Sequence, residues 1–590
     1  MLQGTDRLVL EEPGTPVGRR HHIRGAVFLC LLLVGFCVVV TRLVYLQVFK
    51  HEEYRWRASR QQTKFSIVYA RRGTFYDASM RPLVLSEAVQ SVFVSPVEVE
   101  DLEGTATALA GMLGLDRAKL AEELEQRADL DFMWVKRRVT QEEAEKTAQA
   151  KLTGVHFKTE YRRRYPQGNL ASQTLGWTDI DNRGLEGLEG LFDKELRGVD
   201  GYQRTECDVG RHAVVTDKAE YVPVRHGTNI VLTINLEIQR IVEEEADAVD
   251  EKFGPESLTI IVMDPHRGTI LAVCNRPTFD PARPADVPAE ARQNRAVIAC
   301  YEPGSVFKPF VMSRLFDLGK GTPSEKIFCE NGLFRVPGIK RTLRDHDAYG
   351  WLTLSEVIEK SSNIGMAKVG LALGKDDLYK AVRGFGFGQR TGVEMMGELA
   401  GRLTPEARWS GYTVTSVPMG QEITVTPMQL INAFNVFANG GWLLKPSVVE
   451  AELDSEGKIV KQLCAPERIK RVISGRTAAT MVDIMHKVVL QGTGKAAQGG
   501  EYSKAGKTGT AQKASETGGY SHTKFVASFL CVAPVEDPRI TVLVLVNEPR
   551  KGPSYYAASV AAPSAANIAE RVLKYMKVPP SVSEDRRRTL

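Results

Sequence analysis

The 590-residue chain is poor in cysteine, and its eight cysteines follow no metal-binding pattern. No two of them are separated by only two residues, which argues against structural zinc sites and against thioredoxin-like chemistry. Cys30 and Cys37 fall in an apolar run, and the others are scattered at Cys207, Cys274, Cys300, Cys329, Cys464 and Cys531. We therefore expect buried free thiols, no metal and no cofactor.

An excess of charge of one sign is missing as well. The 77 Lys and Arg against 72 Asp and Glu leave a net charge of +5, which is too small to indicate a nucleic-acid partner. The basic clusters at 162–164 and 586–588 are expected to be solvated surface or tail. Hydrophobic content of 43% is ordinary for a folded protein, and the length predicts two or more domains.

Long hydrophobic runs are absent with one exception near the N-terminus. Residues 25–40 are uninterrupted apolar sequence, which resumes at 43–46 and reaches the roughly 20 residues that cross a bilayer as a helix. A cleaved signal peptide would need a small-x-small site near the end of the run, and residues 38–49 offer none. We favour an uncleaved anchor. Basic residues flank both sides, so charge does not predict its orientation.

The most informative stretch runs from Tyr301 to Phe310. The Pro303-Gly304 pair breaks the chain, and apolar residues at helical spacing follow. In a helix that begins at Ser305, Lys308 shares its face and its amine can reach the Ser305 hydroxyl. A buried lysine serves as a base, and a helix N-terminus favours the anion that develops. The alternative is an ordinary N-cap followed by a solvated lysine.

Two later elements favour the catalytic interpretation. Ser361-Ser362-Asn363 is expected to lie on one helix, and Lys507-Thr508-Gly509-Thr510 is expected to form an edge strand. Ser-x-x-Lys, Ser-x-Asn and Lys-Thr-Gly in this order resemble the signature of penicillin-binding proteins and serine β-lactamases. Ser362 stands where class A β-lactamases have Asp, so that class fits less well, and we expect Ser362 to point elsewhere.

The resemblance extends upstream of residue 220. Arg71-Arg72-Gly73 with Asp77, Arg164-Tyr165-Pro166 and Gly187-Leu188-Glu189 are similar to the pedestal module of class B penicillin-binding proteins. The turn after Asp77 departs from that family, with Ser79-Met80 in place of Asn-Gly. Glu186 and Glu189 could be paired acids, but in a Gly-punctuated loop we expect them to be structural.

The resemblance covers about residues 25 to 578 and implies an α+β fold: a penicillin-binding transpeptidase/serine β-lactamase-like domain, with an antiparallel sheet flanked by helices, preceded by a transmembrane helix and an extended pedestal domain. The implied organisation is a cytoplasmic tail at 1–24, an anchor at 25–48, a pedestal or dimerisation domain at 49–222, a transpeptidase domain at 223–578 and a disordered tail at 579–590.

The resemblance also implies residue roles. Ser305 would attack the penultimate D-Ala carbonyl of a peptidoglycan stem peptide, and Lys308 would be the general base. Ser361 would relay the proton to the leaving amine, and Asn363 would hold the substrate amide and keep Lys308 aligned. Lys507 would bind the terminal carboxylate.

The substrate-binding residues implied in the same way are Thr508, Gly509 and Thr510. Thr508 would donate a hydroxyl, and Gly509 would let a substrate strand approach the backbone. The backbone N–H groups of Ser305 and Thr510 would form the oxyanion hole.

The implied function is a peptidoglycan D,D-transpeptidase that crosslinks stem peptides through a serine acyl-enzyme and binds penicillin. The chain looks most like the septal, FtsI-type branch. Implied partners are stem peptides, β-lactams, an FtsW-like SEDS glycan polymerase, other divisome membrane proteins and the lipid bilayer. The implied location is the inner membrane, single-pass, with a periplasmic catalytic domain. Alternatives are an elongation-specific transpeptidase, a D,D-carboxypeptidase or β-lactamase, and a penicillin sensor; a hydrolase would not need residues 49–222.

Overall fold

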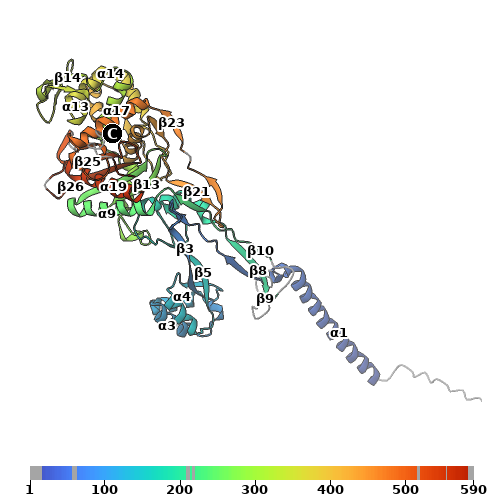
Figure 1. Cartoon of the computed structure of the whole chain (residues 1–590). Helices are drawn as coiled ribbons and strands as arrows, with labels where there is room; N and C mark the ends of the chain where they lie inside the picture. Colours follow the sequence, from blue (N-terminus) through green and yellow to red (C-terminus); the bar gives the residue numbers. More distant parts are fainter. Residues whose placement is uncertain are drawn as a thin grey trace, which may run out of the picture. The chain divides into compact units, whose positions relative to one another are not determined.

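The structure is a computed structural model that describes residues 16–55, 63–207, 213–214, 220–464, 466–514, 519–552 and 554–581. The chain divides into two compact units: residues 1–68 with 200–224, and residues 69–199 with 225–590 (Figure 1). Residues 1–15 of the expected cytoplasmic tail and 582–590 of the expected disordered tail lie outside the described residues.

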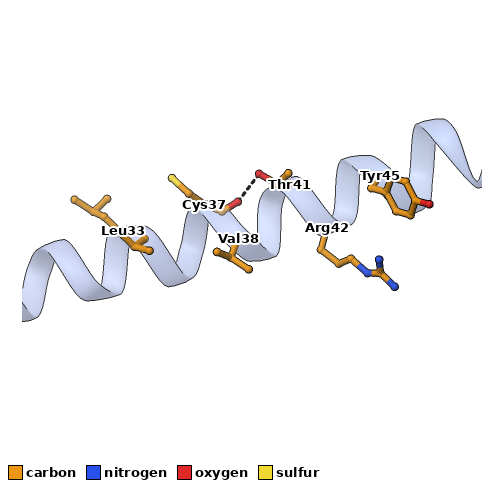
Figure 2. A pocket seen from close by; sticks show the side chains of 7 residues that line it. Leu33, Cys37, Val38, Thr41, Arg42 and Tyr45 are labelled. Atoms are coloured by element: carbon orange, nitrogen blue, oxygen red, sulfur yellow. Dashed lines mark hydrogen bonds between the residues drawn. The ribbon is translucent and has the colours of Figure 1, made fainter.

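The first unit contains the apolar helix. Helix α1 (Pro16–Val44) continues into a π-helical turn, η1 (Tyr45–Phe49). The segment His21–Phe49 is long and apolar enough to cross a membrane, with a mean hydropathy of 2.7 and no part of it buried. Figure 2 shows one face of this helix, where the Thr41 hydroxyl donates to the Cys37 carbonyl at 2.7 Å. The Thr41 hydroxyl is therefore satisfied within the helix and costs little in an apolar environment.

A small antiparallel sheet completes the first unit. Its order is β1 (Thr63–Val68), β8 (Gly201–Cys207) and β10 (Glu220–Val222), and β9 (Ala213–Val214) also pairs with β8.

The N-terminal part of the second unit is built on a seven-stranded sheet in the order β22-β21-β11-β2-β3-β4, with β5 also paired to β3. The strands are β2 (Phe75–Tyr76), β3 (Pro82–Val94), β4 (Met133–Lys136), β5 (Val155–Arg164), β11 (Asn229–Leu232), β21 (Val449–Leu453) and β22 (Ile459–Gln462). Helices α3 (Leu102–Leu113), α4 (Arg117–Gln126) and α5 (Gln141–Gln149) bury a shared apolar core with β3 and β4. All three helices begin at a side-chain cap, which fixes their N-termini.

A buried ion cluster joins Arg72 and Glu189, from two of the upstream motifs, with Arg163, the residue before the third. The Glu189 carboxylate is fully buried and accepts from Arg72 Nε at 2.6 Å and from Arg163 Nε at 2.7 Å. Arg72 also pairs with Asp193 at 2.7 Å. The structural interpretation of Glu189 is confirmed, because its charge is used to neutralise two buried guanidinium groups.

The turn after Asp77 forms without the expected glycine. The Asp77 carboxylate accepts from the backbone N–H groups of Ser79 and Arg81, both at 2.8 Å, and Met80 takes the left-handed conformation at φ 62°. The carboxylate contacts offset the cost of a non-glycine residue at positive φ.

The centre of the second unit is a five-stranded antiparallel sheet in the order β13-β12-β26-β25-β24. Its strands are β12 (Pro255–Asp264), β13 (Thr269–Arg276), β24 (Ala505–Ala514), β25 (Tyr520–Ala533) and β26 (Ile540–Pro549). Successive residues enter different cores: Ile260 and Val262 pack with α9 (Leu236–Phe253) and α19 (Ala562–Tyr575), and Ile261 and Met263 pack on the other face. β12 and β13 pair as an antiparallel hairpin, and α19 packs on the face that α9 also covers.

The second face of this sheet carries the helices that bear the candidate site: α12 (Lys308–Asp317), α13 (Leu354–Glu359), α14 (Asn363–Gly384), α16 (Pro427–Ala438) and α17 (Gly475–Leu490). Shorter elements connect them, namely α6 (Ser172–Leu175), α7 (Gly187–Leu191), α8 (Asp193–Arg197), α10 (Ala289–Arg292), α11 (Arg295–Ile298), α15 (Gly411–Ser416) and α18 (Ala557–Val560). The remaining strands are short pairs: β6 (Trp177–Thr178) with β7 (Gly184–Glu186), β14 (Lys326–Phe328) with β17 (Trp351–Thr353), β15 (Leu333–Arg335) with β16 (Thr342–Arg344), β18 (Arg402–Leu403) with β19 (Ile423–Thr424), and β20 (Trp442–Leu444) with β23 (Arg468–Arg471).

Four of the eight cysteines match the expected buried thiols, and Cys30 and Cys37 on α1 are free and exposed. Cys274, Cys329, Cys464 and Cys531 are buried and free, whereas Cys300 is exposed and free. The side chain of Cys207 lies outside the described part of the chain.

Candidate active site

The candidate nucleophile lies on a short turn rather than on the first residue of a helix. A 3-10 turn, η4 (Gly304–Phe307), precedes α12, so the expected helix start at Ser305 is corrected to Lys308. Gly304 has φ 59°, and its N–H donates to the Gly420 carbonyl at 3.1 Å. A Cβ on Gly420 would lie 2.3 Å from the Gly304 oxygen. Two glycines therefore let two backbone segments meet beside the half-buried Ser305 hydroxyl.

Lys308 is fully buried, and its amine is held by the Ser-x-Asn segment. Lys308 Nζ donates to the Ser361 carbonyl at 2.6 Å, to Ser361 Oγ at 3.1 Å and to Asn363 Oδ1 at 2.9 Å. Burial lowers the pKa of Lys308 to about 7, although the charge of Asp345 opposes this shift. An amine with a pKa in this range is partly neutral near pH 7, and its role as the base stays a prediction.

Ser305 is not among the partners of Lys308. Within the described residues, the Ser305 hydroxyl makes no side-chain hydrogen bond that ties it to the amine. The direct contacts of the lysine are with Ser361 and Asn363, and the expected reach of its amine to the Ser305 hydroxyl stays a prediction.

The Ser-x-Asn segment does not lie within one continuous helix, which corrects the sequence-based expectation. Helix α13 ends at Glu359, α14 begins at Asn363, and Ser361 between them has φ 59°. A left-handed non-glycine residue costs of order 1–3 kcal/mol and persists where its surroundings hold it. Ser362 caps α14 by accepting from Gly365 N at 2.9 Å, and it is buried, so the prediction that it points elsewhere is confirmed.

The Lys-Thr-Gly segment lies on β24, which is the edge strand of the central sheet, as expected. Lys507 is fully buried, and its Nζ donates to Ser361 Oγ at 3.1 Å and to the Thr508 carbonyl at 3.2 Å. Burial lowers the pKa of Lys507 well below its usual range, and the nearby positive charge of Lys308 lowers it further. The two amines thus donate to the same hydroxyl oxygen, that of Ser361.

The rest of β24 packs against the nucleophile turn. A Cβ on Gly509 would lie 2.8 Å from both Val306 Cγ1 and Ser528 Oγ, so this glycine is needed for the close approach of the turn. Thr510 Oγ1 accepts from Ala557 N at 3.1 Å. Thr508 Oγ1 lies 2.8 Å from the hydroxyl of Thr493, a residue between α17 and β24.

The structure therefore brings together Lys308, Ser361, Asn363 and Lys507, which come from segments far apart in the sequence. Ser305 lies on η4, the turn that leads into α12. Sequence reasoning missed Thr493 and Asp345, whose neighbours in the chain carry no recognisable motif. Their contacts depend on tertiary structure alone.

A Lys-Thr-Gly edge strand packed against a Ser-x-x-Lys turn on an antiparallel sheet is the architecture of a penicillin-binding transpeptidase domain. Family comparison agrees: residues 258–570 match the penicillin binding protein transpeptidase domain, and residues 67–232 match the penicillin-binding protein dimerisation domain. The chain belongs to the class B penicillin-binding proteins, a family of peptidoglycan transpeptidases.

Individual relatives span almost the whole chain. It is 32% identical to stage V sporulation protein D of Bacillus subtilis over 94% of this chain and 86% of that protein. It is 30% identical to the peptidoglycan D,D-transpeptidase FtsI of Escherichia coli K12, over 94% of this chain and 92% of that protein. A solved peptidoglycan synthetase from Bifidobacterium adolescentis has a TM-score of 0.71 at 27% identity, covering 89% of this chain and 98% of that one. Penicillin binding protein 3 of Mycobacterium tuberculosis, solved with ampicillin, has a TM-score of 0.69 at 27% identity and covers 88% and 98%.

Proposed function

We propose that the chain crosslinks peptidoglycan stem peptides through an acyl-enzyme on Ser305. Ser305 Oγ attacks the carbonyl of the penultimate D-Ala, the bond to the terminal D-Ala nitrogen breaks, and the amine of a neighbouring stem peptide then takes the acyl group. The observation that carries this proposal is the convergence of two buried amines on Ser361 Oγ beside the Ser305 turn.

The hydrogen bonds support a proton path. In its neutral form Lys308 donates two hydrogens instead of three, so its lone pair becomes free to take the Ser305 proton. The Ser361 oxygen accepts from both lysines, which occupies its two lone pairs and leaves its own O–H to donate. Ser361 is therefore suited to pass a proton to the leaving amine.

Substrate recognition is assigned to β24. Lys507 would pair with the terminal carboxylate, and the Thr508–Thr493 hydroxyl pair would donate beside it. The N–H groups of Ser305 and Thr510 would stabilise the oxyanion, a contribution on the order of 2.7–4 kcal/mol per donor in other enzymes. Gly509 lets the Ser305 turn lie against this strand.

The test of this chemistry is mass spectrometry of the full chain after reaction with benzylpenicillin. We expect one penicilloyl group, on Ser305, that persists for many minutes, and no adduct in Ser305→Ala. An adduct on another residue refutes the assignment of the nucleophile. Rapid release of penicilloate would instead favour the β-lactamase or D,D-carboxypeptidase alternative, and acylation without crosslinking of stem peptides would favour a sensor.

We further propose that α1 anchors the chain in the inner membrane, with residues 1–24 cytoplasmic, 25–48 in the bilayer, 49–222 as the pedestal, and the transpeptidase domain at 223–578 in the periplasm. The chemistry requires that side, because the substrate is extracytoplasmic. Cysteine labelling on either side of residues 21–49 with an impermeant reagent in intact cells tests this orientation.

A septal role, with an FtsW-like glycan polymerase and other divisome proteins as partners, is supported by the similarity to FtsI. The similarity to stage V sporulation protein D favours a second candidate, wall synthesis during sporulation. A fluorescent fusion at midcell in growing cells supports the septal role, and sidewall labelling supports the elongation alternative. A signal confined to sporulating cells supports the second candidate.

A further inference from the structure

The loop after β16 contacts the Ser-x-Asn segment at several atoms. Asp345 follows β16 directly, and its Oδ2 accepts from Ser362 Oγ at 2.6 Å. Its Oδ1 accepts from the backbone N–H groups of Asn363 at 2.5 Å and of Ile364 at 3.0 Å. The carbonyl of Arg344 accepts from Asn363 Nδ2 at 3.2 Å. The last residue of β16 and the residue that follows it thus hold the first turn of α14.

The contact of Asp345 with Ser362 lies next to Ser361, the residue proposed to pass a proton to the leaving amine. Asn363 Oδ1 accepts from Lys308, and Asn363 Nδ2 donates to the Arg344 carbonyl. The second contact fixes the orientation of the amide, so that its oxygen faces the lysine. The neighbouring Ser361 is in the left-handed conformation, which is unfavourable for serine. Something must hold that conformation, and the carboxylate at the helix N-terminus is placed to do so.

On this geometry, which rests on the proposed function of the site, we propose that Asp345 is a positioning residue: it fixes the left-handed turn at Ser361 and orients Asn363, which accepts from Lys308. It does not touch the substrate. Its carboxylate orients Asn363 and Ser361 through the helix terminus, and its negative charge acts on the buried amine.

The groups that surround Lys308 make this effect measurable. Asp345 raises the pKa of Lys308 against the larger effect of burial, and Lys507 is the other charged group that faces the amine. Asp345 also faces the Cys329 thiol and the Tyr349 hydroxyl, and burial is the chief cause that raises the pKa of each. Removal of the Asp345 charge therefore lowers the pKa of Lys308.

The experiment measures the second-order rate of acylation by a fluorescent penicillin from pH 5.5 to 9, using the full chain in detergent. For Asp345→Asn we expect the plateau rate to fall about tenfold or more, because charge-assisted hydrogen bonds are lost. We also expect the acidic limb of the pH–rate profile, the range in which the rate rises with pH, to move to lower pH by about one unit. Asp345→Glu keeps the charge but misplaces it, so its plateau falls while its limb stays at the wild-type pH.

The matched control is Asp101→Asn, which removes a carboxylate cap from α3 in the pedestal, where Asp101 accepts from Gly104 N. Its acylation profile should equal that of the wild type. An Asp345→Asn profile with an unmoved limb overturns the proposal, even if the rate falls, because a purely structural role lowers the rate without moving the limb. Should Asp345→Asn fail to fold, an Asp345→Glu protein with wild-type plateau also overturns it. Failure of the proposed function is distinguishable, since wild type would then form no adduct on Ser305.

Discussion

The pKa of Lys308 gives the sharpest prediction about the chemistry. An ordinary lysine with a pKa of 10.5 is neutral at pH 7 in about one molecule in three thousand, whereas a pKa of about 7 leaves about half of the molecules with a free amine. Burial thus increases the concentration of usable base at neutral pH by more than about a thousandfold. The proposed base acts in its neutral form, so acylation should be lost as the pH falls through 7.

Stopped-flow acylation of the full chain by a fluorescent penicillin measures this dependence. The rate should rise about tenfold per pH unit between pH 5 and 6.5 and become constant above pH 8. Ser305→Ala at each pH corrects for non-specific labelling. A rate that is flat between pH 5.5 and 9, or that still rises tenfold per unit above pH 9, would show that Lys308 is not the base or that its amine is not desolvated.

Three further substitutions test the fold and the carboxylate subsite. Glu189→Ala removes the carboxylate that pairs with buried Arg163 and leaves buried Arg72 paired with Asp193 alone. It should lower the free energy of unfolding by about 3–5 kcal/mol in urea denaturation, whereas Glu103→Ala, in an exposed pair, should change it by less than about 1 kcal/mol. Gly420→Ala places a Cβ 2.3 Å from the Gly304 carbonyl oxygen on η4 and should slow acylation at least about tenfold. A wild-type rate would show that this turn adapts to the added methyl group. Thr493→Val removes the hydroxyl partner of Thr508. It should weaken penicillin binding about fivefold to tenfold and change the limiting acylation rate little. An effect on the limiting rate alone would contradict a binding role.

Local patterns predicted the regular parts of the fold well. Helical periodicity over residues 105–115, 117–125 and 141–150 predicts three helices, and the structure has α3, α4 and α5 there. These helices are predictable because the apolar spacing and the capping residues lie in adjacent sequence. The edge position of β24 followed from its motif. Ser361 was placed on one long helix because apolar residues flank it at helical spacing on both sides. In the structure these apolar residues are divided between two helices, α13 and α14.

The break at Ser361 depends on residues that are distant in the chain. Asp345 and Lys308 hold the turn from sixteen and fifty-three positions away, and neither contact has a local signature. The same holds for Thr493, which lies near the Lys-Thr-Gly segment only because α17 and β24 pack together. Motifs predicted which groups react, whereas the residues that orient those groups became visible only in the structure.

The two lysines have a further consequence for how the proposed site would respond to substrate. Each Nζ lies 3.1 Å from Ser361 Oγ, so the two nitrogens are no more than about 6 Å apart in a buried environment. Two ammonium charges at that separation repel strongly, and the empty site therefore disfavours the doubly protonated state. A ligand carboxylate at Lys507 favours the proton there, and a proton at Lys507 disfavours one at Lys308. Binding of a carboxylate ligand should thus free the base beside Ser305, and a penicillin analogue that lacks the carboxylate should acylate with an acidic limb at higher pH than benzylpenicillin does. Identical limbs for the two compounds would show that the amines titrate independently.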